Sequence, residues 1–406
     1  MRKILLLFIT ASSLLLASGY KIPENSTNAV ALGAANVAHN HNNADAAYYN
    51  PAKMVFMSNE NHIDASLIYI GLNRVNYKGT YTDTTGTNAS DESSEKENFL
   101  VPSLHYVSKE LGNNARVGLS IVSPAGLSKQ WKGTQGSKVS EEFTLETIEV
   151  NPTVAFKVNE KIGLAVGFRA LYSKGVVKLT PSANALVPVS QNMRGDSLDF
   201  GYNLALEYKP TKELEIGLTY RSKIDMTIEG DADLVYSTLL NGNYAASVSL
   251  PVPATFSAAI AYTLPSKTTL EFVYEKTYWS AYQQLDFNYA NATAEAIFGN
   301  ASVKNWKDTN AFRFGLTQEL DKMTLMAGLV FDETPVPDAV ISYELPDSDS
   351  TAISFGGRYK LNESMDVGLS ALYSMRDSRQ VNNSKLVGEF TGGNVLIIST
   401  GIGYKF

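Results

Sequence analysis

The feature that most restricts the fold of this chain is the alternation of side-chain type along most of its length. Between residues 162 and 173, large apolar residues occupy every second position, and small or polar residues, Arg169 among them, lie between. A period of two places the two sets on opposite faces of a β-strand. The same pattern returns at residues 215–221, 312–317, 323–332 and 395–406. In the last stretch Val395 and Ile397 fall on the polar side. The sequence therefore predicts an all-β protein.

The spacing of turns and loops separates a membrane barrel from a soluble sandwich. Six short turns alternate with longer polar segments such as 82–98 and 290–304. The short turns are Gly112-Asn113-Asn114, Asn159-Glu160, Pro210-Thr211-Lys212-Glu213, Pro265-Ser266-Lys267, Asp321-Lys322 and Asn362-Glu363. Outer-membrane barrels have short periplasmic turns and long outer loops, whereas a sandwich has no reason to sort its loops by end. With a first strand at about residues 62–81 and a strand at the end, residues 61–406 are predicted to form a 14-stranded antiparallel transmembrane β-barrel.

Two segments precede the barrel. Residues 1–18 combine Arg2 and Lys3 with an apolar stretch and small residues up to Ser18, the pattern of a cleaved signal peptide. Residues 19–60 do not alternate, and they contain a run of small residues followed by a polar run. A segment of this size before an even-stranded barrel is suited to fill the lumen as a hatch, or plug. The alternative is a disordered periplasmic tail.

Charge and cysteine content narrow the class further. Lys and Arg number 34 against 41 Asp and Glu, for a net charge of −7, and no basic cluster offers a nucleic acid its usual partner. The absence of cysteine excludes disulfides, thiolate metal sites and a lipoprotein anchor. With the signal peptide, these features predict a protein of the Gram-negative outer membrane in contact with lipid and lipopolysaccharide.

Several short motifs occur in a characteristic order. They are Asn50-Pro51-Ala52, Ser123-Pro124-Ala125-Gly126-Leu127 closing at Trp131, Val150-Asn151-Pro152-Thr153-Val154-Ala155, Tyr220-Arg221-Ser222-Lys223, Val252-Pro253-Ala254, Asn305-Trp306-Lys307-Asp308-Thr309 and Thr334-Pro335-Val336-Pro337-Asp338. In these motifs the chain resembles the FadL/TodX family of outer-membrane transporters of hydrophobic compounds. The resemblance implies a barrel closed by a hatch that ends at Asn50, Pro51 and Ala52. It also implies a kinked third strand that lets ligand pass sideways into the outer leaflet.

The third strand itself contains residues that weaken pairing. Pro124 cannot donate to a ladder, and Gly126 has no side chain to pack, so pairing is expected to fail at Pro124, Ala125 and Gly126. An interrupted ladder in a lipid-facing wall is costly unless it lines a cavity. These residues are therefore the candidate lateral gate. The alternative is that they begin an outer loop.

Two segments are unusually apolar for exposed loops, namely residues 179–194 and 231–249. Exposed apolar patches commonly mark a ligand or partner surface. In the family the corresponding loops form the groove that first captures substrate, which implies a groove here. Its candidate residues are Leu186, Val187, Val189, Leu239 and Leu240. The same side chains would also serve a lid that seals the mouth.

Strand parity directs four arginines into the lumen: Arg169, Arg221, Arg313 and Arg358. Lumen charges usually pair with one another and hold barrel and plug together. One of these guanidinium groups is alternatively a receptor for a fatty-acid carboxylate, which it can bind in a bidentate fork.

The predicted function is uptake of hydrophobic compounds, with long-chain fatty acids as the first substrate class and monoaromatic or alkane hydrocarbons as the alternative. A barrel hydrolase is the competing class, but His105 beside Ser103 is its sole candidate and lacks an orienting partner. His39 and His41 form an i, i+2 pair with no evident third ligand. The sequence thus predicts a monomeric transporter, not an enzyme, without metal or cofactor.

Overall fold

The computed structural model describes residues 19–83, 86–112, 114–133, 135–179 and 188–406. The predicted signal peptide, residues 1–18, lies outside them, as does Asn113 of the first short turn. None of the helices among the described residues is long and apolar enough to cross a membrane.

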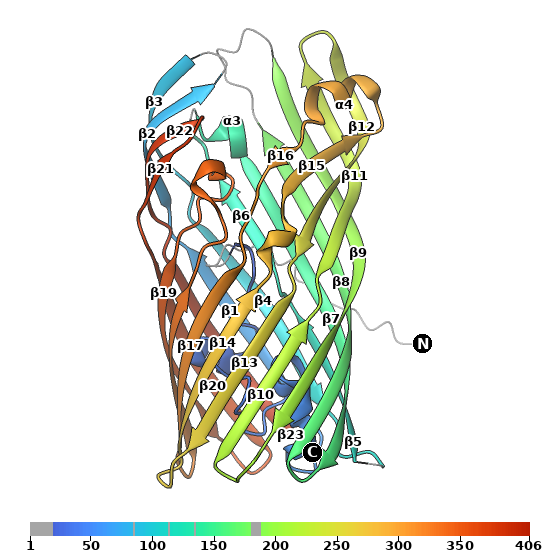
Figure 1. Cartoon of the computed structure of the whole chain (residues 1–406), viewed down its shortest axis with the longest axis vertical. Helices are drawn as coiled ribbons and strands as arrows, with labels where there is room; N and C mark the ends of the chain where they lie inside the picture. The colour runs from blue at the N-terminus through green and yellow to red at the C-terminus, as the bar shows by residue number, and fades with distance from the viewer. Residues whose placement is uncertain (1–18, 84–85, 113, 134, 180–187) are drawn as a thin grey trace.

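The described residues form a closed antiparallel barrel of 14 strands, as predicted (Figure 1). Closure is direct, because β1 pairs with β4 on one edge and with β23 on the other. The wall consists of β1 (His62–Leu72), β4 (Glu97–Val107), β5 (Ala115–Val122), β7 (Glu142–Asn159), β8 (Ile162–Leu179), β9 (Val189–Tyr208), β10 (Leu214–Arg221), β13 (Thr255–Thr263), β14 (Thr268–Thr277), β17 (Thr309–Glu319), β18 (Met323–Asp332), β19 (Ser350–Lys360), β20 (Met365–Arg376) and β23 (Val395–Lys405).

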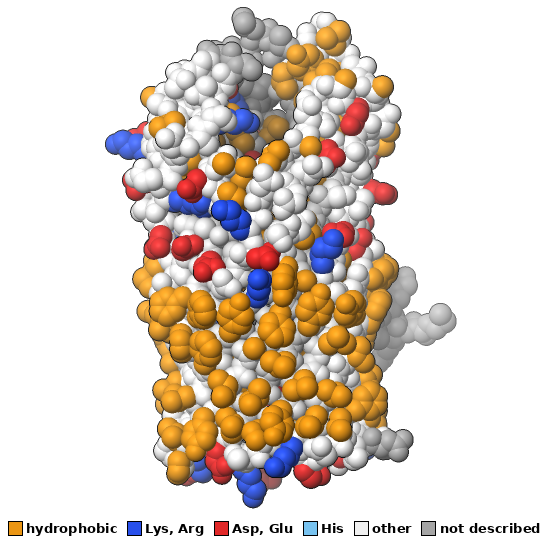
Figure 2. Space-filling model, viewed as in Figure 1, with side chains coloured by type: hydrophobic (Ala, Val, Ile, Leu, Met, Phe, Trp, Pro, Cys, Tyr) orange, Lys and Arg blue, Asp and Glu red, His pale blue; other side chains and the backbone are white. Residues whose placement is uncertain are grey.

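The alternation predicted from sequence is that of the wall. In β8, Leu164 and Phe168 are 43% and 51% exposed, whereas Arg169 between the outward positions is buried. On the face shown in Figure 2, outward apolar residues of neighbouring strands form a band over the half of the barrel nearer the short turns, and charged residues lie above and below it. It matches the apolar band of an outer-membrane barrel. The six predicted short turns all connect consecutive wall strands.

The other end of the barrel is more ordered than the predicted loops suggested. The first strand ends at Leu72, and β2 leaves the wall to join a separate four-stranded sheet. Residues 231–249 are likewise not a loop, because β11 and β12 pair along their whole length. The additional elements are β2 (Val75–Asp83), β3 (Gly86–Ser93), β6 (Gly126–Gln130), α3 (Ser137–Ser140), β11 (Ile224–Tyr236), β12 (Leu240–Val252), η2 (Trp279–Ala281), β15 (Gln284–Tyr289), α4 (Ala292–Phe298), β16 (Ser302–Val303), η3 (Asp338–Val340), β21 (Arg379–Asn382) and β22 (Leu386–Gly392).

The prediction of a single strand at about residues 62–81 is wrong for a physical reason. Buried residues fall at even positions up to Leu72 and at odd positions from Val75 onward. The phase slips at Asn73 and Arg74, neither of which is a glycine or proline that would mark a break. Alternation on both sides of the slip therefore predicts one strand where the structure has two.

Residues 19–58, called here the N-terminal segment, fold into short helices that lie within the ring of strands in the lower part of Figure 1. The helices are α1 (Thr27–Leu32), α2 (Ala46–Tyr49) and η1 (Pro51–Phe56). Ser26 caps α1 by accepting the Ala29 N–H, and Gly33 ends it in the left-handed conformation, with φ of 57°. The α1 helix packs against β18, β19, β20 and β23, whereas η1 packs against β5, β7, β8 and β9.

Inward glycines of the wall make room for the N-terminal segment. A Cβ added at Gly328 would lie 2.4 Å from the Leu32 carbonyl carbon, and one at Gly163 would lie 2.5 Å from the Ala52 oxygen. At these positions the strand and the segment are in backbone contact. The small residues at inward positions of the strands thus reflect close packing against the N-terminal segment.

This contact can be tested with Gly328→Val. The added side chain collides with backbone that cannot rotate away, so we expect the N-terminal segment to be displaced at a cost of about 1–3 kcal/mol. The wall itself should persist, because its pairing is unchanged. Protease digestion of residues 19–58 should accelerate, while heat-modifiable migration on gels remains. Gly242→Val, where an added Cβ would meet only the Tyr244 side chain, at 3.2 Å, is the control. Equal protection of both variants would contradict the packing argument.

Candidate functional site

The Asn50-Pro51-Ala52 motif joins the N-terminal segment to the wall. The Asn50 side chain caps η1 by accepting the Ala52 N–H at 3.1 Å, and Pro51 occupies the first helical turn, where no N–H is needed. The Asn50 amide donates to the Val37 carbonyl at 3.0 Å and to the Glu207 carboxylate at 3.0 Å. Ala52 is fully buried. One side chain thus links two parts of the segment to β9.

Charged side chains of the wall bind the backbone of the N-terminal segment. Glu271 of β14 accepts the N–H groups of Val37, Ala38 and His39 at 2.7, 2.6 and 3.1 Å. Arg313 of β17 donates to the Gly33 carbonyl at 3.0 Å. These bonds satisfy buried peptide groups that have no water to bind, so the lower lumen holds the segment by polar contacts.

The wall is interrupted between β5 and β6. Both strands pair with β7, but Ser123, Pro124 and Ala125 oppose only Thr147 and Ile148, which makes a bulge. The Thr147 hydroxyl holds the bulge through the backbone of Ala125. Pairing resumes at Gly126, so these residues lie within the wall and do not begin a loop.

The N-terminal segment supplies the missing strand contact at the bulge. The Ile22 N–H donates to the Pro124 carbonyl at 2.9 Å, and the Gly126 N–H donates to the Tyr20 carbonyl at 2.8 Å. Lys21 faces Ala125 as an antiparallel bridge. Residues 20–22 thus pair with the bulge from the inside of the barrel.

A window lies beside the bulge. β4 pairs with β5 only from Leu104 to Val107, and among the described residues no strand pairs this edge of β4 from Phe99 to Ser103. Pro102 lies in this stretch. Because proline has no backbone N–H, the open edge has one unpaired donor fewer. Above the window the wall closes again, since the Glu95 N–H donates to the Gln130 carbonyl at 2.9 Å. A groove of about 360 Å³ lies at this place, bounded by β4, β6, β7 and β8, and most of its lining residues are polar, among them Glu97, Glu146 and Lys174.

The interior changes character along the barrel axis. On β1 the inward residues run His62, Asp64 and Ser66 and then Ile68, Ile70 and Leu72. On β23, Val395 and Ile397 are fully buried in the same apolar cluster. The cluster also takes in Tyr20, Ile22, Ala125, Leu127, Trp279 and Trp306. An apolar cluster therefore occupies the upper lumen and reaches the bulge, with Lys129 buried beside Leu72 at its edge. The inward position of Val395 and Ile397, which is irregular for a polar lumen, was the sequence signal for it.

A small cavity of about 70 Å³ lies between the N-terminal segment and the bulge. Its charged lining residues are Lys21, Arg169, Arg221, Arg313 and Glu275. Lys21 and Arg313 both bind Glu275, at 2.5 and 3.1 Å. Nearby, burial raises the pKa of Glu24 to about 7, although Arg313 opposes the shift. The cavity thus has more cationic than anionic lining groups. Lys21 and Glu275 as a pair were not anticipated from sequence.

The four predicted arginines all have carboxylate partners. Arg169 and Arg221 share the buried Glu149, the former at 2.8 Å. Arg358 pairs with Asp64 at 2.6 Å and with Asp366, and it does not line the cavity. Three of the four arginines are thus gathered at one cavity.

The predicted capture residues are divided by the structure. Leu186 and Val187 lie outside the described residues. Leu239 is 72% exposed at the tip of the hairpin, whereas Leu240 is buried in an apolar cluster with Met193 and Leu234. Val189 begins β9 and is half-buried. The described members therefore do not share one exposed surface.

His105 is engaged in structural contacts. Its Nδ1 lies 3.0 Å from the Ser120 hydroxyl and its Nε2 lies 3.0 Å from the Asn25 carbonyl oxygen. The Ser103 hydroxyl, two positions earlier on β4, has no hydrogen bond to His105 or to any other described residue. The ring is fully buried between the wall and the N-terminal segment. These contacts give His105 no carboxylate that would orient it for catalysis.

Comparison with known proteins places this architecture. A long-chain fatty acid transport protein of Shigella flexneri is 25% identical over 374 residues, covering 79% of this chain and 81% of its own. Outer membrane protein P1 of Haemophilus influenzae is 22% identical, covering 94% and 92%. The crystal structure of a Pseudomonas aeruginosa FadL homologue has a TM-score of 0.85 at 19% identity, covering 96% and 100%. That of the P. putida toluene transporter TodX has a TM-score of 0.71 at 14% identity, covering 94% and 98%.

A closed barrel with an apolar band and these relatives defines an outer-membrane protein. The family model for outer membrane transport proteins of the OMPP1/FadL/TodX type matches residues 8–406, and the chain belongs to that family. The resemblance predicted from its motifs is confirmed. Its relatives are named as transporters and outer-membrane proteins, in keeping with the expectation of a non-enzyme.

The shared carboxylate offers a test of the charge network. Glu149→Gln leaves Arg169 and Arg221 buried without an anionic partner, and we expect a loss of about 3 kcal/mol in the free energy of unfolding. Denaturant unfolding of the purified protein in detergent measures it. Glu229→Gln changes an exposed strand glutamate and should have no effect beyond about 0.5 kcal/mol. Equal stability of the two variants would contradict a structural role for the pair.

Proposed function

We propose that this protein takes up hydrophobic small molecules, with long-chain fatty acids as its substrate class, and releases them sideways through the window between β4 and β6. The observation that carries the proposal is the bulge at Ser123–Ala125, which residues 20–22 pair from inside. An aqueous pore has no need of such an opening in its wall. A molecule that prefers lipid gains by leaving through the wall, since it then avoids water.

The apolar upper lumen supports a hydrophobic cargo. Burial of an acyl chain there gains about 25 cal/mol per Å² of apolar surface removed from water. The cluster of Tyr20, Trp279 and Trp306 is continuous with Ala125 and Leu127 beside the bulge. A lipophilic molecule thus meets apolar side chains from the upper lumen to the wall.

We propose further that the N-terminal segment is the hatch of this transporter. Its polar contacts to Glu271 and Arg313 fix its body, whereas residues 20–22 occupy the bulge. The cavity of about 70 Å³ is far smaller than an acyl chain requires. Passage therefore needs residues 20–22 to leave the bulge, and the present arrangement is the closed one.

The cationic cavity favours a carboxylate over a neutral hydrocarbon. Arg221 is the best placed of the three arginines, because it is partly exposed and shares its only ion-pair carboxylate with Arg169. Its guanidinium also lies 4.3 Å from the centre of the Tyr48 ring. The relative with 25% identity is named for long-chain fatty acids, which agrees with this choice.

A reversible disulfide tests the lateral route. The chain contains no cysteine, so Lys21→Cys with Ala125→Cys introduces one defined pair. The two residues form a non-hydrogen-bonded antiparallel pair, with Cα atoms about 4.5 Å apart, a separation that a disulfide spans. We expect labelled oleate uptake by transporter-deficient cells to fall to background when the bond forms and to recover on reduction.

Three controls accompany this experiment. The uptake by each single variant, Lys21→Cys or Ala125→Cys, should be the same in both redox states, whatever its level. Thr263→Cys with Thr269→Cys bridges a wall hairpin whose hydroxyls lie 2.9 Å apart, and it should also transport. Undiminished uptake by the variant that carries both Lys21→Cys and Ala125→Cys, with its disulfide verified by mass spectrometry, would exclude release at this place. Wild-type uptake no greater than that of empty cells would exclude the transport of oleate itself.

The second candidate substrate class is the monoaromatic hydrocarbons, because the toluene transporter TodX has a similar fold, with a TM-score of 0.71. Arg221→Gln separates the two classes. If a carboxylate is bound, oleate affinity should fall at least about tenfold, or about 1.4 kcal/mol, while that of oleyl alcohol changes less than about twofold. Binding titrations with both ligands measure the difference. Equal effects on the two ligands would favour a neutral hydrocarbon.

A further inference from the structure

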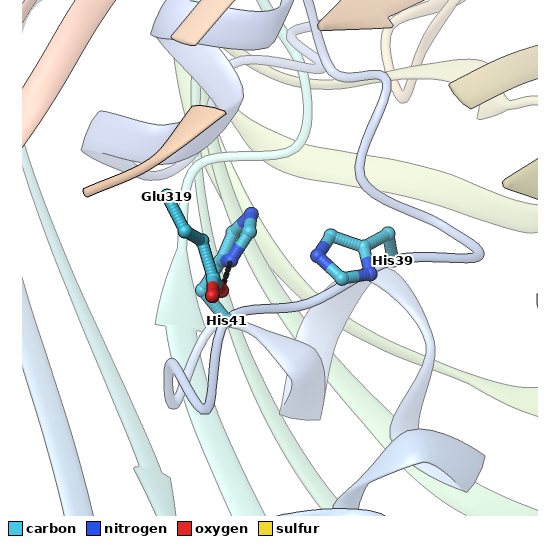
Figure 3. Close-up of side chains that lie close together, drawn as sticks. All are labelled: His39, His41 and Glu319. Atoms are coloured by element: carbon cyan, nitrogen blue, oxygen red, sulfur yellow. Dashed lines mark hydrogen bonds and ion pairs between the residues drawn. The ribbon is translucent and has the colours of Figure 1, made fainter. Parts of the chain in front are cut away.

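Two histidines of the N-terminal segment meet a glutamate of the wall at the short-turn end of the barrel. The rings of His39 and His41 pack edge to face with centroids 4.3 Å apart. The His41 Nδ1 lies 2.7 Å from the Glu319 carboxylate, and Glu319 is the last residue of β17. Figure 3 shows the three side chains converging, with one ring nitrogen of His39 facing His41.

One ring nitrogen of each histidine has no hydrogen-bond partner among the described residues. The Nε2 atoms of His39 and His41 are buried and have no hydrogen-bond partner. A buried polar atom without a partner costs about 1–3 kcal/mol, so the free Nε2 of His39, on the ring that packs against His41, calls for an explanation. The other nitrogen of His39 is already engaged, because its Nδ1 lies 2.9 Å from the Glu215 carboxylate.

We propose that His39, His41 and Glu319 form a binding site for a late first-row divalent cation, with Zn²⁺ as its representative. One ligand atom from each residue lies within 4.8 Å of the others. The ion would take the place of the hydrogen between the His41 Nδ1 and the Glu319 carboxylate, and the free Nε2 of His39 would be its third ligand. Ligands about 2.0–2.1 Å from a tetrahedral ion lie about 3.3 Å apart, so side-chain rotations complete the set. Two imidazoles and a carboxylate are donors that suit Zn²⁺, Ni²⁺ and Cu²⁺.

The surroundings resemble those of a metal site in a further respect. A carboxylate bound to the far nitrogen of a histidine orients the ring and makes it a better ligand, and Glu215 stands in that position toward His39. Lys53 and Lys209 also bind Glu215, Lys53 at the oxygen that His39 contacts and Lys209 at the other oxygen. Glu319 is half-exposed, which leaves an entry for the ion from the short-turn end.

Such an ion would connect two pieces of chain. His39 and His41 belong to the N-terminal segment, whereas Glu319 belongs to the wall. The bound cation would hold the body of the segment in place far from the bulge at Ser123–Ala125. This role does not depend on which substrate the protein carries.

The test uses the mature full-length protein without an affinity tag, purified in detergent and freed of metal. Calorimetric titration with Zn²⁺ should give one equivalent bound. Co²⁺ should give the visible absorption of a tetrahedral ion. His41→Asn and Glu319→Gln should each weaken Zn²⁺ binding at least about tenfold. Glu363→Gln, an exposed glutamate in another short turn, should leave it unchanged.

Heat-modifiable migration on gels verifies that each variant retains the barrel. If His41→Asn does not fold, Glu319→Gln decides, because its amide keeps the size of the side chain and its hydrogen bond. Absence of Zn²⁺ binding by the wild-type protein would overturn the proposal, and the two nitrogens would then serve packing alone. Binding that persists unchanged in Glu319→Gln would overturn it equally, since the ion would be bound elsewhere.

Discussion

Lipid offers no partner to a backbone N–H or C=O, so a sheet that crosses a bilayer must pair every strand on both edges. This constraint explains why β1 pairs with β4 and β23 at once and why the chain forms a ring. It also gives meaning to the opening beside the bulge, where the described wall departs from it. Beside Phe99–Ser103 the ladder is open, and the bulge opposite turns inward to pair with residues 20–22.

The lumen has two parts that differ in the groups its wall presents. In the lower part the wall offers glycines for contact and charges such as Glu271 and Arg313 for hydrogen bonds, and the N-terminal segment takes both. In the upper part Ile68, Ile70 and Ile397 point inward in an apolar cluster, a surrounding that suits a lipophilic molecule. The polar part holds the segment, and the apolar part is left for cargo.

Much of this fold was accessible from the sequence, because a strand with one lipid-facing side must alternate. The closed barrel of 14 strands and its six short turns were predicted and are confirmed. The outer end was not, since β2 and the hairpin of β11 and β12 alternate as well while leaving the wall. Alternation reports that a residue belongs to a strand, and it does not report which sheet the strand joins.

The site was less accessible because its geometry depends on contacts distant in sequence. Pro124 and Gly126 were visible as weak pairing residues, but their partners, residues 20–22, lie about a hundred positions earlier. Parity directed Arg169, Arg221 and Arg313 inward, yet it did not show that they share one cavity while Arg358 stands apart. Glu319 likewise joins His39 and His41 only through the packing of the segment against β17. Such relations appear once the ring has closed.

Residues 20–22 and the body of the N-terminal segment are held by different numbers of hydrogen bonds. Two backbone hydrogen bonds hold residues 20–22 on the bulge, at 2.9 and 2.8 Å, and together they contribute about 1–3 kcal/mol. The body of the segment is held by three bonds to Glu271, by Arg313 on Gly33 and by the contacts of Asn50. Release of residues 20–22 alone therefore breaks fewer hydrogen bonds than release of the whole segment, but it also exposes the buried Tyr20 and Ile22 and separates Lys21 from Glu275. Because Lys21 also binds Glu275, an anion that enters the cavity competes with Glu275 for the same ammonium group. The ligand and the contact at the bulge are thus linked through one side chain.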